Sequence, residues 1–237
     1  NSHRQVIYNS INGSAGQPFN GTMLWESGAS RIYMDNLDGS SQGFGRGQGG
    51  LSDNTRVRAR CETFGMCIVG ERGAIFAGGR TLSDGTFYLR QNDDVGAISR
   101  DGRYAADGGE VRLWDGRAFQ TVGYGLTAIG ATGVRAYVVG SASPTGPTAI
   151  ATAVSINNGG FASFISNRPG SGSFVGVVNT NIAANNFTRL VDLGSGFTSF
   201  GDSNRGGAIN NWNEIAFLAD PSGDGFSGVR RHPILPP

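Results

Sequence analysis

The stretch AINNWNEIAFLAD (208–220) repeats a phrase that the chain has already used at SINNGGFASFISN (155–167). Both contain Ile-Asn-Asn, and both continue into an apolar run in which a small residue precedes Phe. Asparagine and glycine adopt turn conformations that β-branched residues avoid, whereas apolar and aromatic residues suit a partly buried strand. The phrase therefore predicts a turn that leads into a strand.

Four weaker copies of the phrase place turn-forming residues before a run with an aromatic or small apolar residue. They are AIGATGVRAYVVG (128–140), AISRDGRYAADGG (97–109), CIVGERGAIFAGG (67–79) and FNGTMLWESG (19–28). The six copies are anchored, in chain order, on Trp25, Phe76, Ala105, Tyr137, Phe164 and Phe217. Because these anchors lie 27 to 53 residues apart, the spacing predicts about six repeating units.

Every unit continues with one or two further runs of β-branched and aromatic residues bounded by Gly, Asn, Asp and Ser, a pattern typical of short strands. No window has the apolar spacing of a helix. Units of about 40 residues with three or four antiparallel strands fit the blades of a β-propeller. We therefore expect an all-β protein that forms a propeller of about six short blades. The alternatives are five blades, a β-sandwich or a β-solenoid.

We expect residues 1–237 to form one such domain. The 40 glycines between short apolar runs indicate a β-rich fold, and a hydrophobic content of 38% is too high for general disorder. The last unit has only two strand-like runs before the chain reaches HPILPP. The run RQVIYN (4–9) has a strand pattern similar to that of TRLVDL (188–193). We predict that 4–9 adds a strand to the last blade (209–230) and closes the ring.

Composition limits the partners and the compartment. The formal net charge is +1, and all 19 basic residues are arginines without a basic run, so we expect no nucleic-acid partner. No apolar run reaches the length of a membrane-spanning helix. Cys61 and Cys67 are close enough in sequence for a local disulfide across a tight turn, which favours an oxidising compartment. A free buried pair is the alternative.

The two best copies are joined by FTRLVDLGSGFTSFGD (187–202) and are similar to the consensus Asn-x-x-Gly-x-x-Ala-Phe, which neither copy matches in full. They resemble a family of bacterial tandem repeats found in secreted or surface proteins with various C-terminal anchors. The resemblance covers about 150–230, and Trp212-Asn213 departs from the family's Asn-x-Gly step. It implies a repeat architecture and placement at the cell surface, and it brings no chemistry. The matching residues are Asn158, Phe161, Ala162, Phe164, Asn210, Asn211, Ala216 and Phe217.

Catalytic motifs are absent from the sequence. The only histidines, His3 and His232, lie near the ends of the chain, and no nucleophile elbow, phosphate-binding loop or zinc-protease motif occurs. Paired carboxylates remain as the alternative, because glycoside hydrolysis needs two facing Asp or Glu side chains. Six acidic residues fall at similar places in different units and are candidates to converge on one face: Glu26, Glu71, Asp101, Asp107, Glu110 and Glu214.

Two kinds of binding site are suggested by the loops. We expect no cofactor, with calcium as an open alternative at the oxygen-rich turns that contain Asp35, Asp38, Asp220 and Asp224. For an organic ligand, the best candidate is Trp212, which is flanked by Asn210 and Asn211, together with Tyr124. Aromatic rings of this kind stack on sugar rings or fill pockets of a protein partner.

These observations favour a secreted or surface-displayed, non-catalytic scaffold that binds glycan or protein or assembles with copies of itself. Repeated modules present edges and loop faces that suit such contacts. A carbohydrate-active enzyme, a hydrolase or lyase with carboxylates at the mouth of the propeller, is the first alternative. A subunit of an extracellular filament is the second.

Overall fold

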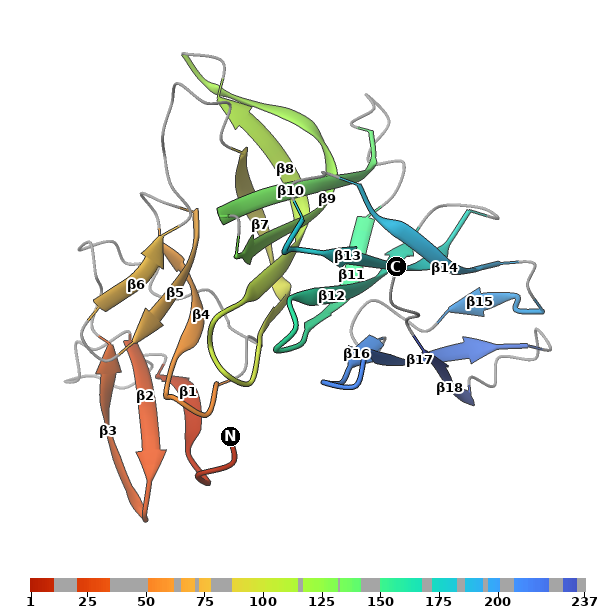
Figure 1. Ribbon diagram of the computed structural model, residues 1–237. Coiled ribbons are helices and arrows are strands. Elements are labelled where there is room, and N and C mark those ends of the chain that lie inside the picture. Colours follow the sequence, from red (N-terminus) through yellow and green to blue (C-terminus); the bar gives the residue numbers. More distant parts are fainter. Residues whose placement is uncertain are drawn as a thin grey trace.

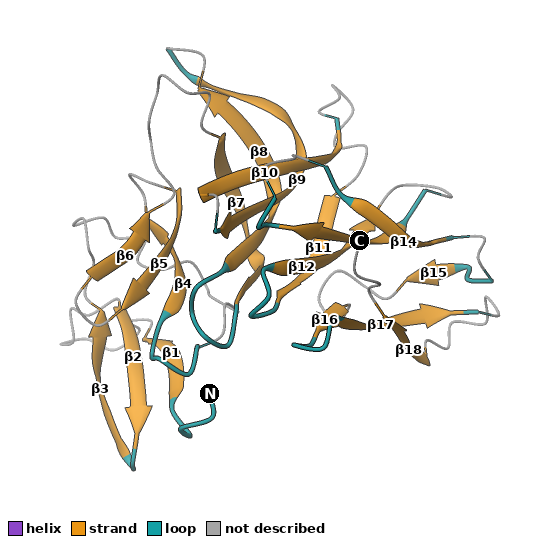
Figure 2. Cartoon of the chain, viewed as in Figure 1, coloured by secondary structure: helices purple, strands orange, loops and turns teal. Residues whose placement is uncertain are grey.

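The computed structural model describes residues 1–10, 21–34, 51–61, 65–70, 73–77, 87–114, 117–131, 133–141, 150–167, 172–182, 186–193, 196–200, 207–221 and 228–233. Within these ranges every regular element is a strand (Figure 2). The prediction of an all-β protein is thus confirmed. The same ranges hold no helix that is long and apolar enough to cross a membrane.

The strands form five small antiparallel sheets that follow one another along the chain (Figure 1). The first sheet contains β1 (Val6–Ser10), β2 (Gly21–Glu26) and β3 (Ala29–Met34), and the second contains β4 (Val57–Cys61), β5 (Gly65–Gly70) and β6 (Gly73–Ala77). The third contains β7 (Phe87–Ile98), β8 (Ala105–Trp114), β9 (Phe119–Gly130) and β10 (Gly133–Gly140). The fourth contains β11 (Ile150–Ile156), β12 (Phe161–Asn167), β13 (Phe174–Asn179) and β14 (Thr188–Asp192). The fifth contains β15 (Ser199–Phe200), β16 (Gly207–Ile209), β17 (Glu214–Asp220) and β18 (Gly228–Pro233).

The five sheets are arranged as the blades of a propeller-like arc, which is open between the first and the fifth sheet among the described strands (Figure 1). The described sheets number five, so the alternative of five blades fits better than six. The third sheet holds two of the sequence copies, 97–109 and 128–140, and the latter lies on the hairpin β9–β10 inside that sheet. A hairpin within a sheet needs the same turn and strand residues as a connection between sheets, which is why these copies were counted as separate units.

The N-terminal strand does not join the last sheet, so that prediction is wrong. Strand β1 pairs along its length with β2, from Val6 opposite Trp25 to Ser10 opposite Gly21. This register places Ile7 opposite Leu24, whose side chain is fully buried. A partner strand that is near in sequence costs less loop-closure entropy than one at the other end of the chain.

The fourth sheet is buried on both faces, and β12 shows how. Phe164 belongs to a cluster with Leu126 and Tyr137 of the third sheet, whereas Ile165 packs with Ile215 of the fifth sheet. Successive residues of a strand point to opposite faces, and both side chains are fully buried. The repeated small–aromatic pair of the sequence therefore fills the space between consecutive sheets.

Aromatic packing fixes the position of Phe164. Its ring meets the edges of Phe174 and Phe187 at centroid distances of 5.9 and 5.8 Å. On the neighbouring strand Gly176 lies beneath this ring, and a Cβ atom there would come within 2.4 Å of Phe164 Cζ. Glycine at 176 is therefore required by the close approach of the aromatic ring.

Cys61 and Cys67 lie on β4 and β5, and their side chains are outside the described part of the structure. The backbone register places Cys67 opposite Ala59 and Cys61 opposite Gly65, so the two cysteines are two positions apart along the ladder. The disulfide stays a prediction.

Replacing Phe164 by Ala is expected to lower the free energy of unfolding by about 3–5 kcal/mol, because it leaves a cavity between the third and fourth sheets. Chemical denaturation followed by circular dichroism measures this loss. The matched control is Val138→Ala on β10, where an exposed side chain is shortened and a change below about 0.5 kcal/mol is expected. Equal losses for the two variants would contradict the assignment of Phe164 to the core.

Candidate functional site

Five turns of one design lie along one edge of the arc, one for each sheet. In every turn the backbone N–H of the first residue donates to the carbonyl of the last, and the N–H of the fourth residue donates to the carbonyl of the first. Each turn leads directly into a strand, namely β1, β4, β8, β12 or β17. We number them turn 1 (Asn1–Gln5), turn 2 (Ser52–Arg56), turn 3 (Ser99–Tyr104, one residue longer), turn 4 (Asn157–Phe161) and turn 5 (Asn210–Glu214).

The first residue of every turn is Asn or Ser because its side-chain oxygen completes the turn. In turn 4, Asn157 Oδ1 accepts from the N–H groups of Gly159 and Phe161, both at 3.0 Å. In turns 1, 2, 3 and 5 the equivalent oxygen accepts from the N–H of the last residue at 2.8–3.1 Å. Short polar side chains are suited to this local bond to the backbone.

The fourth residue of every turn has a left-handed backbone. The φ angles are 58° at Arg4, 58° at Thr55, 67° at Gly102, 75° at Gly160 and 60° at Asn213. Gly and Asn adopt this region readily, whereas a β-branched Thr does so only at a cost. Turns 3 to 5 lie in sequence copies that were recognised, and turns 1 and 2 were missed because Arg and Thr stand where Gly or Asn is expected.

Hydrogen bonds join each turn to the next one. At one end of the row, Asn1 Nδ2 donates to Ser52 O at 2.9 Å and Ser2 N donates to Asp53 Oδ1 at 2.8 Å. At the other end, Asn157 Nδ2 donates to Asn210 O and Asn158 N donates to Asn211 Oδ1, both at 2.9 Å. The same turn positions are paired in both cases, so the contact between neighbouring turns is itself repeated.

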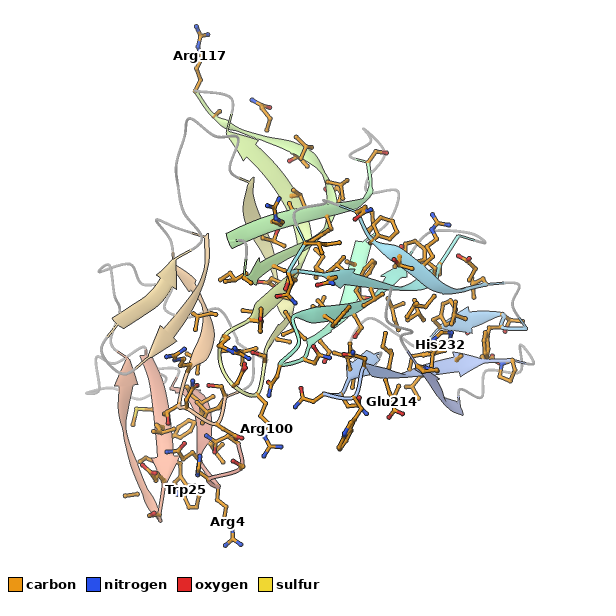
Figure 3. All side chains as sticks on the ribbon, in the orientation of Figure 1. Arg4, Trp25, Arg100, Arg117, Glu214 and His232 are labelled. Carbon is orange, nitrogen blue, oxygen red and sulfur yellow. The ribbon has the colours of Figure 1, made fainter. Side chains whose placement is uncertain are left out.

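The three central turns are joined with slightly different partners. Asp53 N donates to Arg100 O and Asn54 Nδ2 to Asp101 O, both at 2.7 Å, between turns 2 and 3. Asp101 N donates to Asn158 Oδ1 at 3.0 Å between turns 3 and 4. The five turns therefore form one continuous row. Figure 3 shows Arg4, Arg100 and Glu214, from turns 1, 3 and 5, along the same edge of the molecule.

Charged groups in the row are held by defined partners. The Ser2 backbone N–H, then the Ser2 side chain and the Arg100 guanidinium, hold the pKa of Asp53 well below its usual range. Arg100 Nε lies 2.6 Å from Asp53 Oδ2. Asp101, by its hydrogen bond and its charge, raises the pKa of Arg103. Asp53 thus stays ionised and acts as an acceptor between turns 1, 2 and 3.

Three of the predicted catalytic carboxylates do gather at this edge, where each is bound within or beside its own turn. Glu26 Oε1 accepts from Gln5 Nε2 at 2.7 Å, Glu214 Oε2 accepts from Asn210 Nδ2 at 2.8 Å, and Asp101 accepts from Ser99 Oγ at 2.7 Å. Asp107 is buried in β8. Glu71 and the Glu110 side chain lie outside the described part of the structure. The described geometry uses these carboxylates to support turns.

The predicted binding residues have different surroundings. Trp212 is the third residue of turn 5, and 82% of its surface is exposed. Asn210 begins the turn and Asn211 Oδ1 accepts from Asn158 N, so both amides support the row. Tyr124 lies on β9 of the third sheet and does not belong to the row. The structure therefore brings Trp212, Asn210 and Asn211 together and leaves Tyr124 apart.

The calcium prediction gains no support from the described residues. Asp35, Asp38 and Asp224 lie outside them. Asp220 is buried at the end of β17, where its carbonyl accepts from Thr198 N and Thr198 Oγ1 at 2.8 and 2.9 Å. Nowhere in the described ranges do three or more His, Cys, Asp or Glu side chains gather as metal ligands.

Comparison with known proteins gives only distant similarities. No family model and no curated protein sequence matches the chain. TolB from Acinetobacter baumannii is similar in structure at a TM-score of 0.40 and 11% identity, over 92% of this chain and 47% of that one. An endo-arabinase from Bacteroides thetaiotaomicron gives a TM-score of 0.31 and 8% identity, over 98% and 94%. The chain spans about half the length of the TolB structure.

The sheets and the row of turns together define the class of this protein as an all-β, propeller-like repeat fold. Similarities of this size do not indicate a specific function.

Asn157→Ala is expected to lower the free energy of unfolding by about 1–3 kcal/mol, because it removes four partly buried hydrogen bonds to turns 4 and 5. Asn186→Ala, at an exposed position, is the matched control and should change stability by less than about 0.5 kcal/mol. Both values come from denaturant unfolding curves. A loss no larger than that of the control would show that Asn157 does not couple the two sheets.

Asp53→Asn is expected to lower the thermal midpoint at neutral pH and to have little effect in acid. Because folding lowers the pKa of Asp53, its contribution to stability is present above the ordinary carboxyl pKa of about 3.9 and is lost as the pH falls through the folded value. Melting curves of both proteins over an acid-to-neutral pH series measure the difference. Asp192→Asn, in an exposed pair with Arg189 at 3.6 Å, is the control, and a difference that grows in acid would contradict this role.

Proposed function

We propose that this protein is a secreted or surface-displayed, non-catalytic scaffold that binds glycan through Trp212 at the row of turns. The observation that carries the proposal is a largely exposed indole on a turn whose backbone is fixed on both sides. A large aromatic ring in water stabilises the folded chain little, whereas it offers a flat apolar face to a ligand. Sugar rings present matching apolar faces together with hydroxyl groups.

Hydrogen bonds within the protein fix the backbone on both sides of Trp212. Trp212 N donates to Asn210 Oδ1 at 2.9 Å, and Asn213 Oδ1 on its other side accepts from Asn157 Nδ2 at 2.8 Å. Neighbouring Asn211 is tied to turn 4 through Asn158. A preformed site loses less conformational entropy on binding than a mobile loop does.

Polar groups next to the indole suit a hydroxylated ligand. The amide nitrogen of Asn211 lies in an exposed residue, and its oxygen is already used by Asn158 N, so the NH₂ group is the part left to donate. Farther along the row, Tyr104 Oη at the end of turn 3 donates to Asn181 Oδ1 at 3.2 Å. Amide and hydroxyl groups beside an aromatic face recognise the hydroxyls of a sugar and fix its orientation.

The acidic residues of the row support a binding role better than a catalytic one. A glycosidase needs a carboxyl group that holds a proton near neutral pH, whereas Asp53 is shifted in the opposite direction. Glu26, Asp101 and Glu214 are engaged in the turns. Placement outside the cell rests on the predicted Cys61–Cys67 disulfide and on the resemblance to surface repeats.

The test is affinity electrophoresis against xylan, galactomannan, pectin and hyaluronan, followed by titration of the best polysaccharide with tryptophan fluorescence. We expect one polysaccharide to retard the protein and Trp212→Ala to weaken binding at least about tenfold, the loss of a stacking contact of roughly 1.4 kcal/mol. Trp212→Phe keeps an aromatic face and should retain most of the affinity, and Tyr124→Ala should bind as the parent does. Unchanged binding by Trp212→Ala, or no binding to any polysaccharide, would overturn the proposal.

A further inference from the structure

Most hydrogen bonds between neighbouring turns run in one direction along the row. In all four contacts between neighbouring turns, backbone or amide N–H groups of the earlier turn donate to oxygens of the later one. Two side-chain bonds run the other way: the ion pair from Arg100 to Asp53, and the bond from Thr55 Oγ1 to Gln5 Oε1 at 3.3 Å. A row built in this way ends in unused donors at turn 5 and unused acceptors at turn 1.

Turn 5 carries the donors. Asn210 Nδ2 donates to Glu214 Oε2 at 2.8 Å, as Asn1 Nδ2 does to Gln5 Oε1 at 2.7 Å. In turn 1 the same amide also donates to Ser52 O of the following turn, and an NH₂ group has a second hydrogen for this purpose. In turn 5 that second hydrogen and the N–H of Asn211 meet no partner within the described ranges.

Turn 1 carries the matching acceptors. In turn 2, Ser52 O accepts from Thr55 within the turn and also from Asn1 of the preceding turn. The equivalent carbonyl in turn 1, Asn1 O, accepts only from Arg4 within the described chain. The Ser2 hydroxyl stands at the position held by Asp53 in turn 2, and a hydroxyl beside a carboxylate keeps lone pairs that accept.

The apolar faces of the first and fifth sheets also lack one neighbouring sheet each among the described strands. The residue directly after a turn faces the preceding sheet: Ala105 packs with Ile68, Ala162 with Leu126, and Ile215 with Val175. The first sheet has no preceding sheet among the described strands, and there the equivalent residue, Val6, is 53% exposed.

Two further apolar side chains share the open face of the first sheet. Tyr8, at the next position on the same face as Val6, is 42% exposed. Trp25, which lies directly opposite Val6 on β2, is 39% exposed. The equivalents of Tyr8 in the strands after turns 4 and 5 are Phe164 and Phe217. Both are buried by the sheet before them. These three residues, Val6, Tyr8 and Trp25, form the surface that we call the open first face.

The fifth sheet has the complementary surface. In β12 the second and fourth residues after the turn, Ser163 and Ile165, are fully buried, and Ile165 is covered by the following sheet. In β17 the equivalent residues, Ala216 and Leu218, are only half-buried. Leu218 therefore lies on the face that a following sheet would cover.

We propose that the open first face and turn 1 of one copy bind the fifth sheet and turn 5 of a second copy, head to tail. The contact repeats the internal one: Asn210 Nδ2 and Asn211 N–H of one copy donate to Asn1 O and Ser2 Oγ of the other, while Leu218 packs on Val6, Tyr8 and Trp25. Because the two surfaces differ, the contact is heterologous and extends into a ring or a filament.

The assembly and the glycan site meet at Asn211 but use different groups of it, the backbone N–H and the side-chain NH₂. Where a following turn is present, the third residue is exposed in turns 1, 2 and 4, as His3, Asn54 and Gly159 show, and half-buried in turn 3, at Asp101. Trp212 holds that position in turn 5, so a second copy leaves the indole accessible. Trp212→Ala should remove glycan binding and leave the assembly unchanged, which separates failure of one proposal from failure of the other.

The test combines one variant for each surface, measured by light scattering after size exclusion and by sedimentation velocity across a wide range of concentration. Tyr8→Asp places a charge on the open first face. Asn211→Pro removes the donor N–H, and proline is favoured at the second position of such turns. Asn211→Ala is its control, because it shortens the same side chain and keeps the N–H.

The parent protein and Asn211→Ala are expected to exceed the 24.7 kDa of one chain with rising concentration. Tyr8→Asp and Asn211→Pro should each remain at that mass when alone. Their equimolar mixture should form a dimer and nothing larger, since it offers one intact surface of each kind. A parent that stays monomeric, a variant that dimerises alone, or a mixture that stays monomeric would each overturn the proposal.

Discussion

The arrangement depends on the side chains that begin turns 1 and 4, because each bonds both to its own turn and to the backbone of the next turn. Asn157 shows this role most fully, because its oxygen closes turn 4 while its nitrogen reaches the Asn210 carbonyl and the Asn213 amide of turn 5. It is almost completely buried, so losing either bond would leave polar groups unsatisfied. One amide thus couples the local conformation of a turn to the position of the next sheet.

Packing between the sheets follows from this coupling. Once a turn is fixed, the side chains of the following strand alternate between the two neighbouring sheets, and Phe164 and Ile165 fill both gaps. A shift of one residue in β12 would exchange these two side chains and disrupt both clusters. The turns therefore set the register that the apolar clusters require, and the clusters in return hold adjacent turns within hydrogen-bonding distance.

The sequence predicts the local part of this design and not the part that joins distant segments. Asn, Ser and Gly at 99, 102, 157 and 160 indicate turns 3 and 4, and the runs after them indicate strands. Turns 1 and 2 escape notice because Arg4 and Thr55 are held in a left-handed backbone that only tertiary contacts justify. Trp212 was predicted from its setting, but the structural use of Asn211 depends on Asn158, 53 residues away. The pairing of β1 with β2 could not be predicted either, because β2 and the strands of the last blade have similar sequence patterns.

The couplings differ in their partners but form one continuous row, and this continuity limits where a ligand can bind. Each turn uses its donors on the next turn and its acceptors on the previous one, so the interior of the row presents few free polar groups to a ligand. The free groups collect at the two ends, where turn 1 and turn 5 lack one neighbour each among the described residues. Trp212 and Asn211 lie at one of these ends, and Val6, Tyr8 and Trp25 lie at the other. Recognition is therefore expected at the ends of the arc, while the carboxylates within the row maintain its geometry.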